Sequence, residues 1–152
     1  LETVTGLCGP LARRFLERGI RIGRESSSQT DLIERLYANA LVNEQPAYTA
    51  NKLPPIQEPL ADSDEIYTSV LLCEQVSLAV AAFAFGKGVP EVCIPLIVQI
   101  GRDCDSAGTA VGSWCGALHG ESGLPDAWVK TVCEVNMPEI DIRGLADGLI
   151  RK

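Results

Sequence analysis

The stretch Val-Ser-Leu-Ala-Val-Ala-Ala-Phe-Ala-Phe, residues 76–85, decides the fold of this chain. It is apolar all round, as is typical of a helix that is covered on every side. Asp62 and Glu65 lie just before it and resemble a capping box, so we expect one long helix over residues 63–85. A membrane span needs about 20 apolar residues, and this run has half that number. The sequence therefore predicts a central core helix and no membrane segment.

Upstream of this core helix, apolar residues recur at helical spacing over residues 11–24 and 30–41, which predicts two further helices. Residues 44–60 separate them from the core helix. This segment is broken by prolines at positions 46, 54, 55 and 59. Prolines at this density exclude regular helix, and loops of this length are usually functional, disordered or bound to a partner.

Downstream, residues 86–88 (Gly-Lys-Gly) end the core helix, and Pro90 begins a helix that reaches about Ile100. Pro95 should weaken or kink its first turns. Residues 141–152 form a weakly amphipathic helix at the end of the sequence. Helix therefore follows helix along the chain, and the predicted fold class is all-α.

Charge limits the kinds of partner that this chain can bind. Thirteen basic and 20 acidic residues give a net charge of −7. Nucleic acids are bound by clusters of Lys and Arg, whereas the densest basic run here, over residues 13–24, is spread around a helix. We therefore expect no nucleic-acid partner.

The six cysteines include no Cys-x-x-Cys pair, and the sequence begins with no signal peptide. We expect these thiols to act as small buried hydrophobes in a reducing compartment, which predicts a cytoplasmic location. Cys104 lies between two acidic residues, but its soft thiolate does not suit a hard cation. The single histidine, His119, is expected to pack or to cap a helix, since one His cannot build a catalytic triad.

The strongest functional signal is the turn Gly-Arg-Asp-Cys-Asp-Ser at residues 101–106. A helix N-cap accounts for one of the carboxylates Asp103 and Asp105, but not for both. Two like charges ~4 Å apart repel by ~4 kcal/mol at an effective dielectric near 20, so convergent side chains imply a cation between them. With the hydroxyl of Ser106, these donors suit Mg²⁺ or Mn²⁺ better than Zn²⁺. The alternative is that both carboxylates face water at the start of the helix.

The helix after this turn carries glycine at every fourth position, at 108, 112, 116 and 120. Each glycine within a helix costs ~1 kcal/mol relative to alanine, so another interaction should offset the loss. The spacing lays the glycines along one ridge. We therefore expect a neighbouring helix to cross this ridge and to hold the acidic turn rigidly.

Residues 101–132, GRDCDSAGTAVGSWCGALHGESGLPDAWVKTV, resemble the C-terminal signature of the ADP-ribosylglycohydrolase family, typified by the dinitrogenase reductase-activating glycohydrolases. The family pattern has a Gly-x-Asp-x-Asp-[Thr/Ser] turn, found here at residues 101–106. A Gly-Ala-x-x-Gly helix end follows at 116–120, and a Pro-x-x-Trp helix start at 125–128. The resemblance is strongest over residues 66–135 and loose over residues 1–60.

The resemblance implies an orthogonal multi-helix bundle that holds two Mg²⁺ ions and hydrolyses an ADP-ribosyl bond in a modified side chain or small molecule. Asp103, Asp105 and Ser106 would be metal ligands, with Ser106 in place of the more usual Thr. In the implied mechanism the metal pair orients the ribose hydroxyls and positions a water for attack at the anomeric carbon. Asp103 is the carboxylate assigned to take the proton from that water, although an acidic residue of the missing N-terminal motif could equally do so.

The chain departs from the family in one respect. Members also need an N-terminal Thr-Asp-Asp motif and an upstream acidic residue, and this sequence contains no Asp-Asp pair. At most half of a binuclear site is therefore present. We expect residues 1–152 to form a single helical domain or the C-terminal portion of one, completed by a missing N-terminal segment or by homo-oligomerisation through apolar faces. The alternative function is a non-catalytic interaction or oligomerisation module with a vestigial cation-binding turn.

Overall fold

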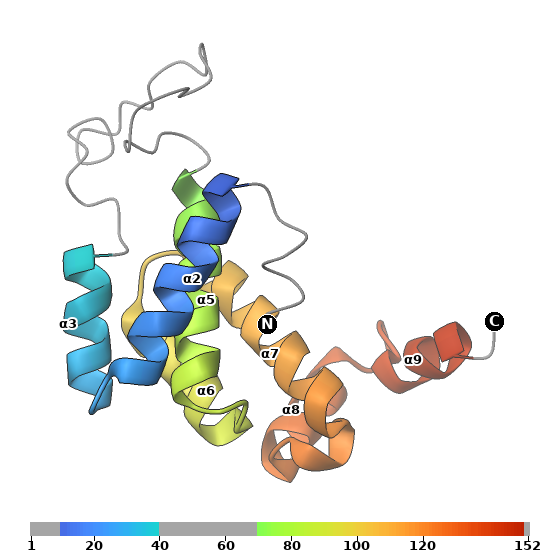
Figure 1. The fold of residues 1–152 in the computed structure, drawn as a ribbon. Coiled ribbons are helices and arrows are strands. Elements are labelled where there is room, and N and C mark those ends of the chain that lie inside the picture. The colour runs from blue at the N-terminus through green and yellow to red at the C-terminus, as the bar shows by residue number, and fades with distance from the viewer. Residues whose placement is uncertain (1–9, 40–69, 151–152) are drawn as a thin grey trace.

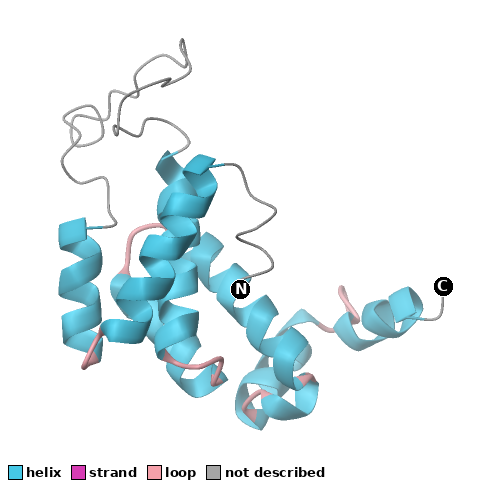
Figure 2. Cartoon of the chain, viewed as in Figure 1, coloured by secondary structure: helices cyan, strands magenta, loops and turns pink. Residues whose placement is uncertain are grey.

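A computed structural model describes residues 10–39 and 70–150, and every secondary-structure element in those ranges is helical (Figures 1 and 2). The elements are α2 (Pro10–Glu25), α3 (Gln29–Asn39), α5 (Val70–Phe85), α6 (Pro90–Ile100), α7 (Cys104–His119), the 3₁₀ turn η1 (Glu121–Gly123), α8 (Asp126–Asn136) and α9 (Ile142–Ile150). The predicted all-α fold is confirmed.

The helix boundaries follow the local sequence signals closely. Helix α6 begins at Pro90 and continues through Pro95, which does not end it. The core helix ends at Phe85, before the glycine-rich turn, as predicted. The expected capping box at Asp62 and Glu65 and the expected loop over residues 44–60 lie outside the described residues.

Helix α5 is the centre of the fold. Five consecutive residues of α5, Leu78 to Ala82, are each at most 1% exposed to solvent. Helix α2 packs along one side of α5, while α6 and α7 cover others (Figure 1). The rings of Phe83 on α5 and Trp114 on α7 meet edge to face, with centroids 5.7 Å apart. The predicted central core helix is confirmed, and no helix within the described residues is long and apolar enough to cross a membrane.

The closest helix contact is between α2 and α5. A Cβ atom on Gly19 would lie 2.5 Å from the backbone oxygen of Ser77, and one on Gly23 would collide with the backbone oxygen of Ala81. The Ser77 hydroxyl donates a hydrogen bond of 3.1 Å to the carbonyl of Phe15, which closes the same contact. Because only glycine leaves room for this approach, the pair at 19 and 23 fixes how α2 lies on α5.

The expected helix crossing at the glycine ridge of α7 is not observed among the described residues. A Cβ atom on Gly108 would meet only Ile97, at 3.8 Å, and one on Gly112 or Gly116 would meet nothing within 4 Å. The prediction was wrong because the adjacent ridge of α7, and not the glycine ridge, packs against α5 and α6. That ridge consists of Ala107, Val111 and Cys115, which are all buried. Its larger apolar side chains gain more free energy from burial than glycines do.

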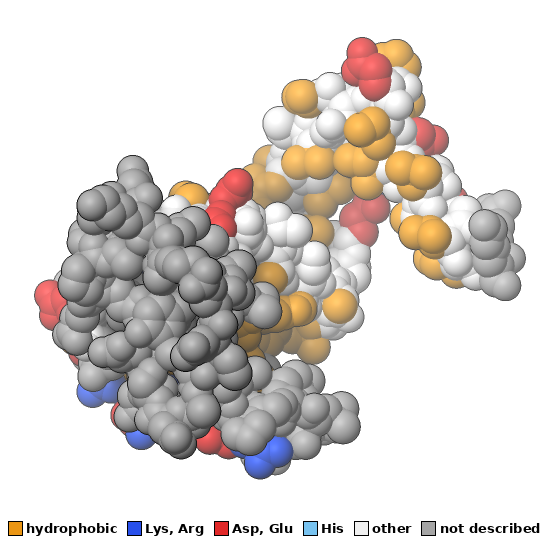
Figure 3. All heavy atoms as spheres, turned by 90° about the horizontal axis from the view of Figure 1, so that it is seen from above, with side chains coloured by type: hydrophobic (Ala, Val, Ile, Leu, Met, Phe, Trp, Pro, Cys, Tyr) orange, Lys and Arg blue, Asp and Glu red, His pale blue; other side chains and the backbone are white. Residues whose placement is uncertain are grey.

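Helices α8 and α9 form an arm, residues 126–150, that extends beyond the end of α7 and away from the bundle of α2, α3, α5 and α6 (Figure 1). No residue of the arm is buried. Hydrophobic side chains gather over it instead (Figure 3). The most exposed of them are Val135, Leu145, Leu149 and Ile150.

The α2–α5 contact predicts opposite effects for two glycine-to-alanine substitutions. Gly19→Ala should lower the free energy of unfolding by about 1–3 kcal/mol, because the added methyl group has no room. Gly116→Ala, in open space on α7, should raise it by up to about 1 kcal/mol through helix propensity. Urea unfolding followed by circular dichroism measures both. Equal effects of the same sign would contradict the packing described here.

Candidate metal centre

The turn between α6 and α7 has an unusual backbone. Gly101 has φ 78° and ψ −148°, a region that is essentially restricted to glycine, and Arg102 follows with φ 65°. The hydroxyl of Tyr37, on α3, donates a hydrogen bond of 2.8 Å to the carbonyl of Ile100 at the end of α6. The turn is therefore sharply bent and is anchored from a helix far away in the sequence.

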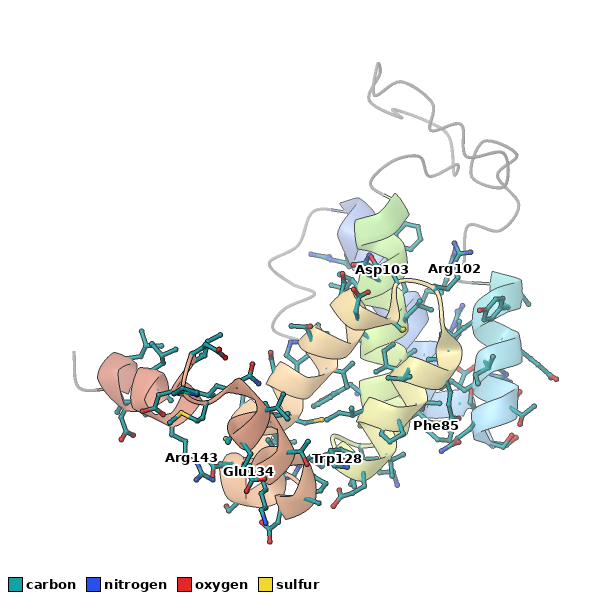
Figure 4. The ribbon with its side chains drawn as sticks, turned by 180° about the vertical axis from the view of Figure 1, so that it is seen from behind. Phe85, Arg102, Asp103, Trp128, Glu134 and Arg143 are labelled. Atoms are coloured by element: carbon teal, nitrogen blue, oxygen red, sulfur yellow. The ribbon has the colours of Figure 1, made fainter. Side chains whose placement is uncertain are left out.

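Asp103 occupies the N-cap position of α7, but its side chain makes no capping hydrogen bond. Instead, its Oδ2 atom accepts a hydrogen bond from Nε2 of Gln75, on α5. The residue is half-buried and lies at the end of the bundle opposite to Trp128, Glu134 and Arg143 (Figure 4). The carboxylate of Asp103 is thus oriented by a neighbouring helix rather than by its own.

Asp105 and Ser106 lie in the first turn of α7, and both are exposed. Hydrogen bonding with the side chain of Asp103, and then the backbone N–H groups of Ser106 and Asp105, hold the pKa of Asp105 below its ordinary value. The side chain of Asp103 is thus the main influence on the titration of Asp105. The alternative in which both carboxylates face water holds for Asp105, which is exposed, but not for Asp103, which is half-buried.

The donors that the turn offers are chemically matched to a hard divalent cation. Two carboxylates and a hydroxyl supply only oxygen, and Mg²⁺ is usually held by one or two carboxylates while it keeps several waters. Within the described ranges, no group of three or more His, Cys, Asp or Glu side chains is arranged to hold a metal ion. The residues fit Mg²⁺ or Mn²⁺, and their role as ligands stays a prediction.

The structure gives His119 a structural role, as expected. Its Nε2 atom lies 3.0 Å from the carbonyl oxygen of Gly88, so the ring joins the end of α7 to the turn after α5.

The expectation that the cysteines are buried holds for two of the four described. Cys93 and Cys115 are fully buried, and burial raises the pKa of the Cys93 thiol to about 12 and also raises that of Cys115. Cys104 and Cys133 are half-buried, and all four of these thiols are free. Cys104 therefore lies within the acidic turn without being fully buried.

A groove lies between α7 and the arm. This groove has a volume of about 940 Å³ and is lined mainly by apolar side chains, among them Ile94, Leu124, Trp128, Val132 and Ile142. At its polar side, Arg143 and Glu121 form an ion pair of 2.6 Å. The groove is remote from Asp103, so its apolar surface suits packing rather than the chemistry of the acidic turn (Figure 4).

Two residues that shape the turn, Gln75 and Tyr37, were not found by sequence reasoning. Their partners lie 28 and 63 residues further along the chain. No local pattern connects residues at such separations. The only available signal was the presence of a glutamine near the apolar run of the core helix.

The protein-family model described as ADP-ribosylglycohydrolase matches residues 6–152. No curated protein and no solved structure matches.

The influence of Asp103 on the pKa of Asp105 predicts a specific change in titration. In the metal-free protein, Asp105 should titrate below its ordinary pKa, and Asp103→Ala should raise that pKa by removing the largest cause of the shift. The stabilisation linked to Asp105 is present above its ordinary pKa and is lost as the pH falls through the lowered value.

Carboxyl ¹³C NMR measures this pKa. Asp31 on α3 is the control, because a backbone hydrogen bond from Ser27 is the main cause that lowers its pKa, and Asp103→Ala should leave it unchanged. An unaltered Asp105 titration in the variant would contradict an interaction between these two side chains.

Proposed function

Because the chain belongs to the ADP-ribosylglycohydrolase family, which its match over residues 6–152 establishes, we propose that it is a metal-dependent hydrolase that cleaves an N- or O-glycosidic ADP-ribosyl bond. One observation carries the proposal. The carboxylate of Asp103, at the start of α7, accepts a hydrogen bond from Gln75 of α5, and it lies in the motif by which the chain resembles the family. The proposed substrate is an ADP-ribosylated side chain or a related small molecule.

In this proposal Asp103, Asp105 and Ser106 hold Mg²⁺ or Mn²⁺, which when bound lowers the pKa of a coordinated water and polarises the substrate. The family's site is binuclear, and this sequence supplies at most half of its ligands. Oδ2 of Asp103 accepts the Gln75 amide, so Oδ1 is the atom that we propose takes a proton from the attacking water. The remaining ligands would come from a segment with the Thr-Asp-Asp motif.

A second candidate function is a non-catalytic helical interaction module in which the acidic turn is vestigial. It is favoured by the observation that the described residues gather no set of three or more His, Cys, Asp or Glu side chains suited to a metal. Metal binding by the acidic turn separates the two candidates, because a vestigial turn would take up at most one weakly held cation.

We further propose that the protein forms homo-oligomers through the arm. Its helices expose many large apolar side chains and bury none of them, and association would remove that surface from water. The free thiols of the described cysteines support the proposal of a cytoplasmic location.

The metal hypothesis predicts that Asp103→Ala and Asp105→Ala each weaken Mg²⁺ binding by at least about 10- to 100-fold, because a lost ligand costs no less than a lost outer-shell partner. Isothermal titration calorimetry measures the affinity. When the Thr-Asp-Asp segment is supplied, Mg²⁺-dependent release of ADP-ribose from ADP-ribosylated arginine should fall in the same variants.

Glu34→Ala removes an exposed carboxylate on α3 and should change neither measurement. Absence of ADP-ribose release, together with Mg²⁺ affinity that Asp103→Ala leaves unchanged, would reject the hydrolase in favour of the interaction module.

The arm hypothesis predicts a dimer or larger assembly in light scattering coupled to gel filtration. The double variant Leu145→Glu and Leu149→Glu should shift the protein to a monomer, because it places charge on side chains that are 61% and 77% exposed. Val98→Glu on α6 is the matched control, since Val98 is also exposed, at 56%, but lies outside the arm. A wild-type protein that stays monomeric at every concentration would disprove oligomerisation.

A further inference from the structure

We propose that Gln75 is a positioning residue for the acidic turn, and that its side-chain amide holds the carboxylate of Asp103 in the orientation needed to bind the cation. The inference rests on the proposed function, because it assigns a task to a residue next to the candidate metal ligands. It concerns a contact between α5 and the start of α7 that joins residues 28 positions apart.

The first argument is the state of Asp103 itself. An aspartate at an N-cap ordinarily accepts hydrogen bonds from the backbone N–H groups of its own helix, and such a cap fixes its side chain. Asp103 makes no such bond. Its Oδ2 atom accepts from Nε2 of Gln75 instead, so the helix that orients this carboxylate is α5.

The second argument is the chemistry of the donor. A glutamine amide is neutral, so it can fix one oxygen of a carboxylate without cancelling the negative charge. A lysine or arginine at this place would compete with a bound cation for that charge. Gln75 therefore fixes Oδ2 of Asp103 without adding a positive charge beside the carboxylate.

The third argument is the place of Gln75 in α5. Burying a polar side chain without a hydrogen bond costs free energy, so each polar side chain near the core is expected to have a hydrogen-bond partner. Ser77, two residues later, donates a hydrogen bond from its hydroxyl to the carbonyl of Phe15 and so stabilises the α2–α5 contact. Gln75 is half-buried and directs its amide to Asp103.

The turn is thus held from two helices. Tyr37 of α3 binds the carbonyl of Ile100 on one side of Gly101, and Gln75 of α5 binds Asp103 on the other side. Partners that orient metal ligands typically change metal affinity by about 10- to 100-fold when they are removed.

The test compares Gln75→Met with Ser77→Ala in the full chain. Methionine keeps the length and helix propensity of glutamine but cannot donate a hydrogen bond. Gln75→Met should weaken Mn²⁺ binding, measured by electron paramagnetic resonance, by about 10- to 100-fold. Ser77→Ala loses a buried hydrogen bond in the same helix, so it should lower the melting temperature without changing Mn²⁺ affinity.

Mn²⁺ affinity in Gln75→Met equal to that of the wild type would overturn the inference, whatever the melting temperature. If the wild type binds no Mn²⁺, the proposed function is rejected, and NMR then tests the Gln75–Asp103 contact by itself. The side-chain amide resonances of Gln75 in ¹H–¹⁵N spectra should still shift on Asp103→Ala. Unshifted amide resonances would reject the Gln75–Asp103 contact independently of any metal.

Discussion

The burial of α5 is the constraint on which the rest of the structure depends. Over residues 76–85 this helix has no polar face, so it is stable only when neighbours cover it on several sides. Helices α2, α6 and α7 supply that cover. The closest approach, at Gly19 and Gly23, lets the backbones of α2 and α5 touch and leaves the larger side chains to fill the space elsewhere.

The acidic turn takes its geometry from this core. Helices α6 and α7 must both pack on α5, and the chain between them has only three residues in which to reverse. The sharp bend at Gly101 and Arg102 is the consequence. It brings Asp103 against the early part of α5, where Gln75 meets it, so the helix that organises the core also orients the candidate metal ligand.

The two ends of α7 serve different purposes. Its start carries Asp103, whose carboxylate is held by Gln75 of α5, and rigid support of this kind is what a metal or catalytic site requires. Its far end leads into an arm that covers no core and exposes apolar side chains. Among the described residues nothing packs closely on Gly112 or Gly116 of α7, so these glycines do not set the position of the turn, contrary to the prediction from their spacing.

The sequence by itself determined the helices, the buried segment and the acidic turn. These features depend on signals within a few residues of each other, such as the glycines after Phe85, Pro90 at the start of α6, and the spacing of Asp103 and Asp105. Local chemistry sets where a helix starts and stops, so reading the chain in order was enough.

Only the tertiary structure decided which ridge of each helix packs and which side chains reach the turn. Gly112 and Val111 lie on neighbouring ridges of the same helix, and the choice between them follows from the side chains of α5 and α6. The contacts of Gln75 with Asp103 and of Tyr37 with Ile100 likewise join distant parts of the chain. Such contacts depend on the shapes of two packed surfaces at once, and neither segment carries that information alone.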